Sequence, residues 1–297
     1  MGSFEGHVQP GTFFFLFGCW FTYQVFLKYF LCQRAKALAT SGGKGRSRLY
    51  HNTSSFSSPC CRVVPLEGIL KITAALVGMT GEFVTGFDDQ HHLSLHNVQH
   101  MTMFFFFGVN GATDIVMHYR LPVPPDLDYV SGLLALVMEG LLFFYHLHGR
   151  PPMDVQVHML LFYVVMACAA SIFFEMCHKS NVLPALCRSY FTLLQGTWFY
   201  QIGFVLYPPS GWKTWEQDDH HQMMLVTLLF TWHNATIFLL MSLAGSLVYL
   251  RVKKMPPAVF YRYLMYYHLT PPSASCLVDP SDQSKAMLVN DSEEEEV

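Results

Sequence analysis

The chain contains stretches long enough to cross a bilayer that carry no charged side chain at all. Residues Ser189–Tyr207 and Met223–Leu250 contain no Asp, Glu, Lys or Arg. An α-helix rises about 1.5 Å per residue, so about 20 mostly apolar residues cross the roughly 30 Å of hydrocarbon in a bilayer. Across all 297 residues only 13% are charged, whereas soluble domains carry about 25%. The sequence therefore predicts a membrane protein.

Seven segments are long and apolar enough, which predicts an all-α fold: a polytopic seven-helix transmembrane bundle. Breaks at Pro122–Pro125, Gly149–Pro152 and Tyr207–Gly211 separate neighbouring segments, because proline cannot continue a helix. The second segment is the least apolar, since it includes Glu67 and Glu82. The predicted spans are Gly11–Leu31, Val64–Gly86, Asn97–Tyr119, Leu127–His148, Asp154–His178, Leu183–Tyr207 and His221–Leu250.

Basic residues in the loops indicate the orientation, since Lys and Arg concentrate on the cytosolic side of membrane proteins. The first ten residues and the loop Phe87–His96 contain neither residue type, and Arg150 and Lys213 are the only basic residues on that side. We therefore predict an outer or lumenal N-terminus and a cytosolic C-terminus, which agrees with an odd number of spans. The first loop contains Arg34, Lys36, Lys44, Arg46, Arg48 and Arg62, and the flank after the last span contains Arg251, Lys253 and Lys254.

Two parts of the chain are predicted to lie outside the packed spans. The basic loop at about 33–63 is rich in Ser and Gly, and the segment 255–297 ends in a run of glutamates. Such compositions are typical of mobile loops and disordered tails. The predicted domains are therefore a transmembrane domain over 1–254, which includes the mobile loop, and a disordered cytosolic tail over 255–297. The eight cysteines lack metal-binding or disulfide spacing, so free thiols are expected.

Five ionisable residues near the cytosolic ends of the spans form a layer that can neutralise itself. Ionisable groups inside a bilayer are costly and normally face a partner. Glu67 and Lys71 are four residues apart, hence neighbours on one helix face. With three acids and two bases, this inner layer is interpreted as structural. Its members are Glu67, Lys71, Asp114, Glu175 and Arg188.

A second layer, between the outer surface and the middle of the bilayer, contains carboxylates and histidines but neither Lys nor Arg. Buried carboxylates without a fixed cation must take up protons, pair with imidazolium or bind a metal ion. Imidazole and carboxylate groups are also metal ligands in helical bundles. The layer contains Glu82, His100, Glu139, His146, His158, Gln201 and His233, and the outer rim adds His91, His92, His96, His148, His220 and His221.

This outer layer predicts a site for one divalent transition metal, zinc or iron, as the only cofactor. Glu139 and His146 share a face of the fourth span but lie seven residues, about 10 Å, apart along its axis. His96 and His100, four residues apart, could form a two-histidine clamp. The alternative left open is a hydrogen-bonded network of packed histidines and a protonated carboxyl group. The candidate metal ligands are His100, Glu139, His146, His158 and His233.

Several motifs carry a family resemblance. They are the stretches Gly6–Phe15, Tyr145–Arg150 after Glu139, Leu194–Gly211 and Trp232–His233. With them the chain resembles the transmembrane protein 45 family, most closely its A type, over about residues 1–255. The resemblance implies a seven-span protein of the endomembrane system, in the Golgi or endosomes rather than the plasma membrane, without a settled activity. The family pattern has matching residues at His100, Glu139, His146, His148, His158, Glu175, Gln195, Gln201 and His233.

The residues leave several functions open. A metal- or proton-binding membrane protein without an assigned reaction is favoured, and a structural or trafficking partner is the first alternative. A lipid-modifying metalloenzyme suits the ligand types, but histidine-box spacing is absent, so a protein that is not an enzyme is favoured. A transporter would be expected to contain repeats or paired broken helices, and neither is found.

The expected partners follow from the same features. The lipid bilayer surrounds most of the chain, and the absence of a basic stripe argues against nucleic acid. A homodimer and a small-molecule ligand stay open. The third span lacks the Asp/Glu-Arg-Tyr triplet of many seven-helix receptors, and the seventh lacks a lysine that could hold retinal. The chain is therefore not expected to be a receptor of either kind.

Overall fold

The computed structural model describes residues 3–41, 50–56, 64–88, 90–267 and 269, and these are helical apart from short connections. An isolated bridge between Phe87 and Leu93 is the β-pairing within this part of the chain. The helices are α1 (Phe4–Ser41), α2 (Leu66–Thr85), α3 (Leu95–His118), α4 (Leu127–His146), α5 (Pro152–Cys177), α6 (Val182–Leu206), α7 (His220–Lys254) and α8 (Pro257–Tyr266).

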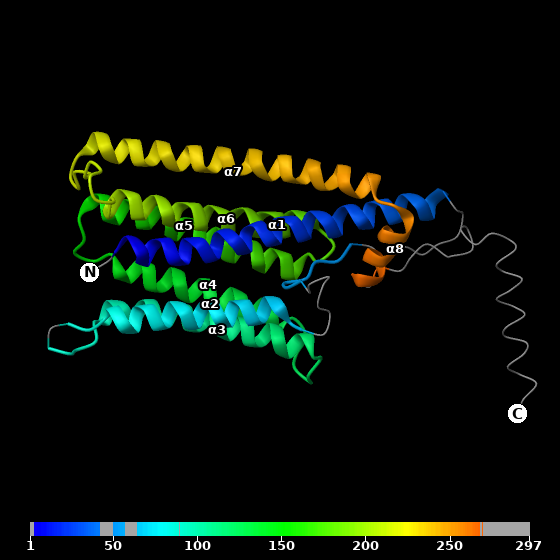
Figure 1. Ribbon diagram of the computed structural model, residues 1–297, viewed down its shortest axis with the longest axis horizontal. Coiled ribbons are helices and arrows are strands. Elements are labelled where there is room, and N and C mark those ends of the chain that lie inside the picture. Colours follow the sequence, from blue (N-terminus) through cyan, green and yellow to red (C-terminus); the bar gives the residue numbers. More distant parts are fainter. Residues whose placement is uncertain (1–2, 42–49, 57–63, 89, 268, 270–297) are drawn as a thin grey trace, which may run out of the picture. The chain divides into compact units, whose positions relative to one another are not determined.

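The chain divides into two compact units. The first comprises Met1–Phe26 and Tyr50–Val248, and the second comprises Leu27–Leu49 and Tyr249–Val297. In the first unit consecutive helices pack side by side, α2 against α3, α3 against α4, α4 against α5 and α5 against α6 (Figure 1). The candidate site residues predicted above all belong to this first unit.

Each predicted span coincides with a helix, and five of these helices are long and apolar enough to cross a membrane. These five are α1, α2, α4, α5 and α7. Helices α3 and α6 have 24 and 25 residues, but buried polar side chains such as Asp114 and Gln195 make them less apolar. The chain is therefore a multi-pass helical membrane protein, with a helix at every position where a span was predicted.

Helix boundaries in the second unit correct two expectations. Residues 33–41 were predicted to belong to a mobile loop, yet α1 continues through Ser41. Residues 257–266 were predicted to belong to a disordered tail, yet they form α8. Arg34 explains both, since its Nη1 donates to the carbonyl oxygens of Val252, at 2.6 Å, and Met255, at 2.9 Å. Its guanidinium also lies 4.4 Å from the ring centre of Phe260.

Glycines bring α1 and α6 of the first unit into backbone contact. A Cβ atom added to Gly196 would lie 2.5 Å from the backbone nitrogen of Phe15, and one added to Gly18 would lie 2.7 Å from the Leu193 side chain. Gly68 and Gly111 allow the same close approach between α2 and α3. Small residues at helix crossings are the usual means of packing within a bilayer, where apolar burial provides little driving force.

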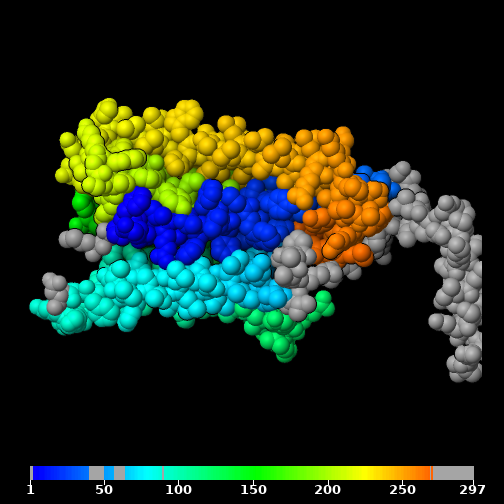
Figure 2. All heavy atoms as spheres, viewed as in Figure 1, coloured from blue at the N-terminus to red at the C-terminus, as the bar shows by residue number. Residues whose placement is uncertain are grey.

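The first unit has a packed core and an apolar exterior. Trp198 is fully buried and donates its indole N–H to the carbonyl oxygen of Val157 at 2.9 Å. Leu239 on α7 is 66% exposed, and neighbouring apolar residues are exposed to a similar extent. Figure 2 shows α7, the first part of α1 and α2 on one face of this unit. Such an exposed apolar face is suited to lipid rather than to water.

Candidate functional site

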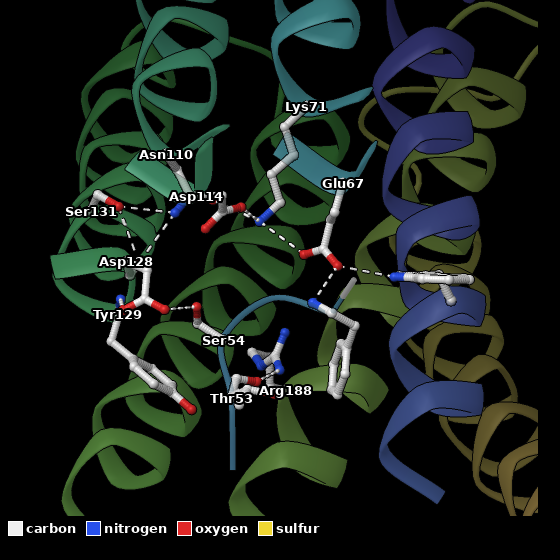
Figure 3. A network of polar contacts seen from close by, with 12 residues as sticks. Thr53, Ser54, Glu67, Lys71, Asn110, Asp114, Asp128, Tyr129, Ser131 and Arg188 are labelled. Atoms are coloured by element: carbon white, nitrogen blue, oxygen red, sulfur yellow. Dashed lines mark hydrogen bonds and ion pairs between the residues drawn. The ribbon is translucent and has the colours of Figure 1, made fainter. Parts of the chain in front are cut away.

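The charged residues of the inner layer lie on α2, α3, α5 and α6. Hydrogen bonds through Asn110 on α3 and through Asp128 and Tyr129 on α4 connect them, and Figure 3 shows most of this network. Lys71 lies 3.3 Å from Glu67 and 2.6 Å from Asp114. Arg188 lies 2.7 Å from the buried carboxylate of Glu175. Each base has a carboxylate partner, and the predicted pairing of Glu67 with Lys71 is confirmed.

The same network fastens the segment 50–56 onto the bundle. Glu67 Oε2 accepts hydrogen bonds from the backbone N–H of Phe56, at 2.9 Å, and from the indole N–H of Trp20, at 3.0 Å. Ser54 donates to Asp128, and the carbonyl oxygen of Thr53 accepts from Arg188 at 3.4 Å (Figure 3). The charges of the inner layer are therefore accounted for by a structural role, which is to hold the segment 50–56 on the bundle.

At the other end of the bundle, the structure corrects the expectation of a layer without a basic group. Arg150 was assigned to the loop outside the spans. Its Nη2 donates to His146 and, at 3.3 Å, to Nδ1 of His96, while Nη1 lies 3.0 Å from the carboxylate of Asp154. Gly149, with φ of +78°, precedes it in the left-handed region that glycine adopts without strain.

Three histidines of this layer gather where α3 meets the end of α4. One ring nitrogen from each of His96, His100 and His146 lies within 4.8 Å of the others. The ring centres are 4.4 Å apart for His96 and His100 and 4.1 Å apart for His96 and His146. All three rings are half-buried. We call this group the three-histidine cluster.

Neighbouring acceptors orient two rings of the three-histidine cluster. The Nδ1 atom of His100 lies 3.0 Å from Glu82, whose other oxygen accepts from Asn97 at 2.7 Å. The Nδ1 atom of His146 lies 2.7 Å from the side-chain oxygen of Gln99. Since both partners are acceptors, both Nδ1 atoms carry the proton, and in the neutral rings Nε2 keeps its lone pair. Histidines that bind metals are commonly oriented in this way.

The remaining predicted ligands lie elsewhere in the first unit. His158 is bonded to Asp154, with 2.8 Å between Nδ1 and the carboxylate, and its ring lies 5.7 Å from that of His7. His233 faces the indole of Trp198, at 5.5 Å between ring centres. It lines a groove with residues of α1, α6 and α7. The structure thus brings together His100 and His146 of the predicted set, and it adds His96.

Glu139 lies beside a cavity of about 170 Å³ in the interior of the first unit. The side chain is 2% exposed, and its Oε2 atom has no hydrogen-bond partner among the described residues. The cavity is lined by residues of α1 to α6, among them Phe14, Phe143 and Phe199. No motif in the sequence predicted a cavity, because its walls come from six separate helices.

These features define a multi-pass helical membrane protein with a charged network near one end of the bundle, a cluster of histidines near the other end and a cavity lined by six of its helices. Residues 125–245 of the sequence match a family model that is described as a family of unknown function, DUF716. That range contains α4, α5, α6 and most of α7, but not the α3 histidines.

The chain is also similar to curated membrane proteins. Transmembrane epididymal protein 1 from Homo sapiens is 30% identical over 142 residues, which cover 46% of this chain and 50% of that protein. Its counterpart from Rattus norvegicus is 25% identical over 241 residues, 78% of this chain and 76% of that protein. Transmembrane epididymal protein 1A from Mus musculus is 24% identical over the same shares. The chain thus spans about half the length of the human relative.

Proposed function

We propose that this protein binds one divalent transition metal through His96, His100 and His146. The observation that carries the proposal is the convergence of three ring nitrogens within 4.8 Å. Around a tetrahedral zinc ion, with Zn–N bonds of about 2.1 Å, ligand nitrogens lie about 3.4 Å apart. Small rotations of the rings bring the three-histidine cluster to that spacing. Glu82 and Gln99 already hold two of the rings in the ligating tautomer.

Arg150 competes with the metal for the same lone pairs. Its Nη2 contacts both His96 and His146, and guanidinium is only a donor. Binding of a metal ion therefore requires this group to withdraw. Asp154, 3.0 Å from Nη1, offers a position to which the guanidinium can turn. Under this proposal Arg150 weakens metal binding, because a fixed positive charge repels the ion.

Elemental analysis of the purified, full-length protein tests the metal. We expect about one zinc or iron per chain after incubation with the metal salt, and a loss of that metal in His100→Ala and His146→Ala. His91→Ala is the matched control, since its side chain is exposed at the rim. Zinc at about 100 times its dissociation constant should also stabilise the fold by about 2.7 kcal/mol. Metal content that is unchanged in His100→Ala would contradict the site.

A second candidate function, a lipid-modifying metalloenzyme, is favoured by one observation. His100 and Glu82 also line the central cavity, whose other walls include eight phenylalanine residues. A metal held by three histidines keeps an open position for water or substrate. Turnover of a lipid ester or amide by the zinc-loaded protein, abolished in His100→Ala, would support this function. Stoichiometric zinc without turnover would leave a binding protein.

We further propose that the chain belongs to the transmembrane protein 45 family, nearest its A type, as a seven-span protein of the Golgi or endosomes. The similarity to DUF716 and to the epididymal membrane proteins supports this assignment. A cytosolic C-terminus is supported by the basic residues that end α7. Imaging of the full-length protein with organelle markers tests the compartment, and residence at the plasma membrane alone would contradict it.

A further inference from the structure

The central cavity combines aromatic walls with one carboxylate that lacks a partner. The rings form a continuous series along it. Phe107 lies 5.5 Å from Phe14, Phe14 stacks on Phe199 at 5.7 Å, and Phe143 lies 6.1 Å from Phe199, as measured between ring centres. Glu139 precedes Phe143 by one helical turn on α4, so both project to the same side. Both residues line the cavity.

The other carboxylates at the cavity wall already have partners. Glu82 accepts from Asn97 and contacts His100, and Asp128 accepts from Ser54. Among the lining carboxylates of the described chain, Glu139 is therefore distinguished by a buried oxygen without a hydrogen bond. A buried acceptor that is left without a partner destabilises the fold, and more so when it is charged.

The cations at the wall are also committed, so neither supplies the missing partner. Lys71 is bonded to Glu67 and Asp114, and Arg188 is bonded to Glu175. The lining histidines are engaged as well: His7 contacts the carbonyl oxygen of Ser3, His100 contacts Glu82, and His158 contacts Asp154. In the described part of the chain none of these groups is bonded to the buried oxygen of Glu139, which leaves it open to a ligand from outside.

We propose that the cavity binds a small organic ammonium ion, with its charged nitrogen against Glu139 and its apolar part among the phenylalanine rings. Aromatic faces attract ammonium groups, and the attraction grows when water is excluded. A metal ion would find one carboxylate and hydrocarbon at this point, which does not complete a coordination shell. The proposal rests on Glu139 and the phenylalanine rings and not on the three-histidine cluster, although His100 lines the same cavity.

The volume of the cavity limits the ligand to about the size of a substituted benzene. An engineered protein cavity of about 150 Å³ binds benzene, and the cavity here measures about 170 Å³. Benzylammonium is therefore a suitable probe, and benzyl alcohol is its uncharged counterpart of nearly the same shape. The difference between the two isolates the interaction with the carboxylate.

Isothermal titration calorimetry of the full-length protein in an uncharged detergent tests the proposal. We expect benzylammonium to bind at least about tenfold more tightly than benzyl alcohol, since a charge-assisted bond is worth about 1.5–3 kcal/mol. Glu139→Gln keeps the size of the side chain and should remove this preference. Asp218→Asn is the matched control, because it neutralises an exposed carboxylate away from the cavity.

A second variant keeps the test informative if Glu139→Gln does not fold. Leu136 is 4% exposed and lines the cavity on the same helix as Glu139. Leu136→Phe adds volume there and should block both probes while Glu139 remains. Equal affinity for the two probes, no binding of benzylammonium, or undiminished binding in Leu136→Phe would each overturn the proposal.

An amine on a lipid headgroup offers the same chemistry as a free amine. The titration is therefore repeated in nanodiscs of phosphatidylcholine and of phosphatidylglycerol. Undiminished binding of benzylammonium in both identifies a site for free amines. Binding that is lost in phosphatidylcholine alone identifies the choline headgroup as the competing ligand, and the carboxylate and aromatic rings keep the role proposed here.

Discussion

Arg150 donates a hydrogen bond to Nε2 of His146, the residue four positions earlier, across the turn that ends α4. This contact fixes the tautomer of His146, because a guanidinium cannot accept a hydrogen bond. It also directs a positive charge at the lone pairs on which the proposed metal site depends. A metal site and a purely hydrogen-bonded cluster therefore predict opposite effects when Arg150 is replaced.

Replacing the arginine separates these two possibilities. In Arg150→Met the repulsion is removed and the lone pairs of His96 and His146 become available, so zinc should bind at least about tenfold more tightly than to the natural protein. A competition titration with a fluorescent zinc chelator measures the difference. If the cluster serves only to bind Arg150, the variant should lose thermal stability and gain no zinc affinity.

A second prediction concerns the inner charged layer. Lys71→Met leaves Glu67 and Asp114, which are 5% and 3% exposed, without their shared cation. Breaking a buried ion pair costs about 3–5 kcal/mol, so the melting temperature of the solubilised protein should fall markedly. Fluorescence-detected thermal unfolding measures the change.

The compensating variants show whether the loss is electrostatic. Glu67→Gln/Lys71→Met should recover part of the stability, because Asp114 stays charged. Adding Asp114→Asn should recover most of it. A Lys71→Met protein that melts like the natural one would mean that the pairing is not important for folding.

The helices were accessible from the sequence because their signal is local. A run of apolar residues such as 223–250 indicates by itself a helix in an apolar environment, and the prolines between segments mark the ends of the helices. Glu67 and Lys71 could be paired for the same reason, since four residues along a helix give neighbouring side chains. In both cases one segment contains the whole of the evidence.

What the sequence missed depends on segments that meet only in the folded chain. Arg150 reaches His96 on α3 because Gly149 turns the chain back. Asn52 is 2% exposed because Asn181 and Lys179 accept its hydrogen bonds. Neither contact leaves a periodic pattern in the sequence. Cys60, Cys61 and Cys276 lie outside the described residues, while the five cysteines in the described part are free thiols, as expected.

The predicted orientation can be tested with the acceptor sequons of the chain. Asn52 begins one sequon, and both its side chain and its backbone N–H are bonded within the first unit. Asn234 begins another inside α7, and Asn290, outside the described residues, begins a third. With a cytosolic first loop and C-terminus, none of the three should carry a glycan, and glycosidase treatment should leave the mobility of the protein unchanged.

An N-terminal extension with its own sequon provides the positive control for this test. It should become glycosylated, because the N-terminus is predicted on the lumenal side. A mobility shift of the natural protein that disappears in Asn52→Gln would reverse the orientation.

The last prediction concerns the crossing of α1 and α6 at Gly196. A Cβ atom at this position would lie 2.5 Å from the backbone nitrogen and 2.8 Å from the Cα atom of Phe15. A backbone cannot rotate away as a flexible side chain can, so Gly196→Ala should force the helices apart and cost about 1–3 kcal/mol. Gly81→Ala is the matched control, since its nearest neighbours are side-chain atoms of Gln9 at 3.5 Å and 3.9 Å. There alanine should stabilise α2 by about 0.5–1 kcal/mol. Thermal unfolding of the two variants should therefore shift in opposite directions, and equal shifts would contradict the close contact between α1 and α6.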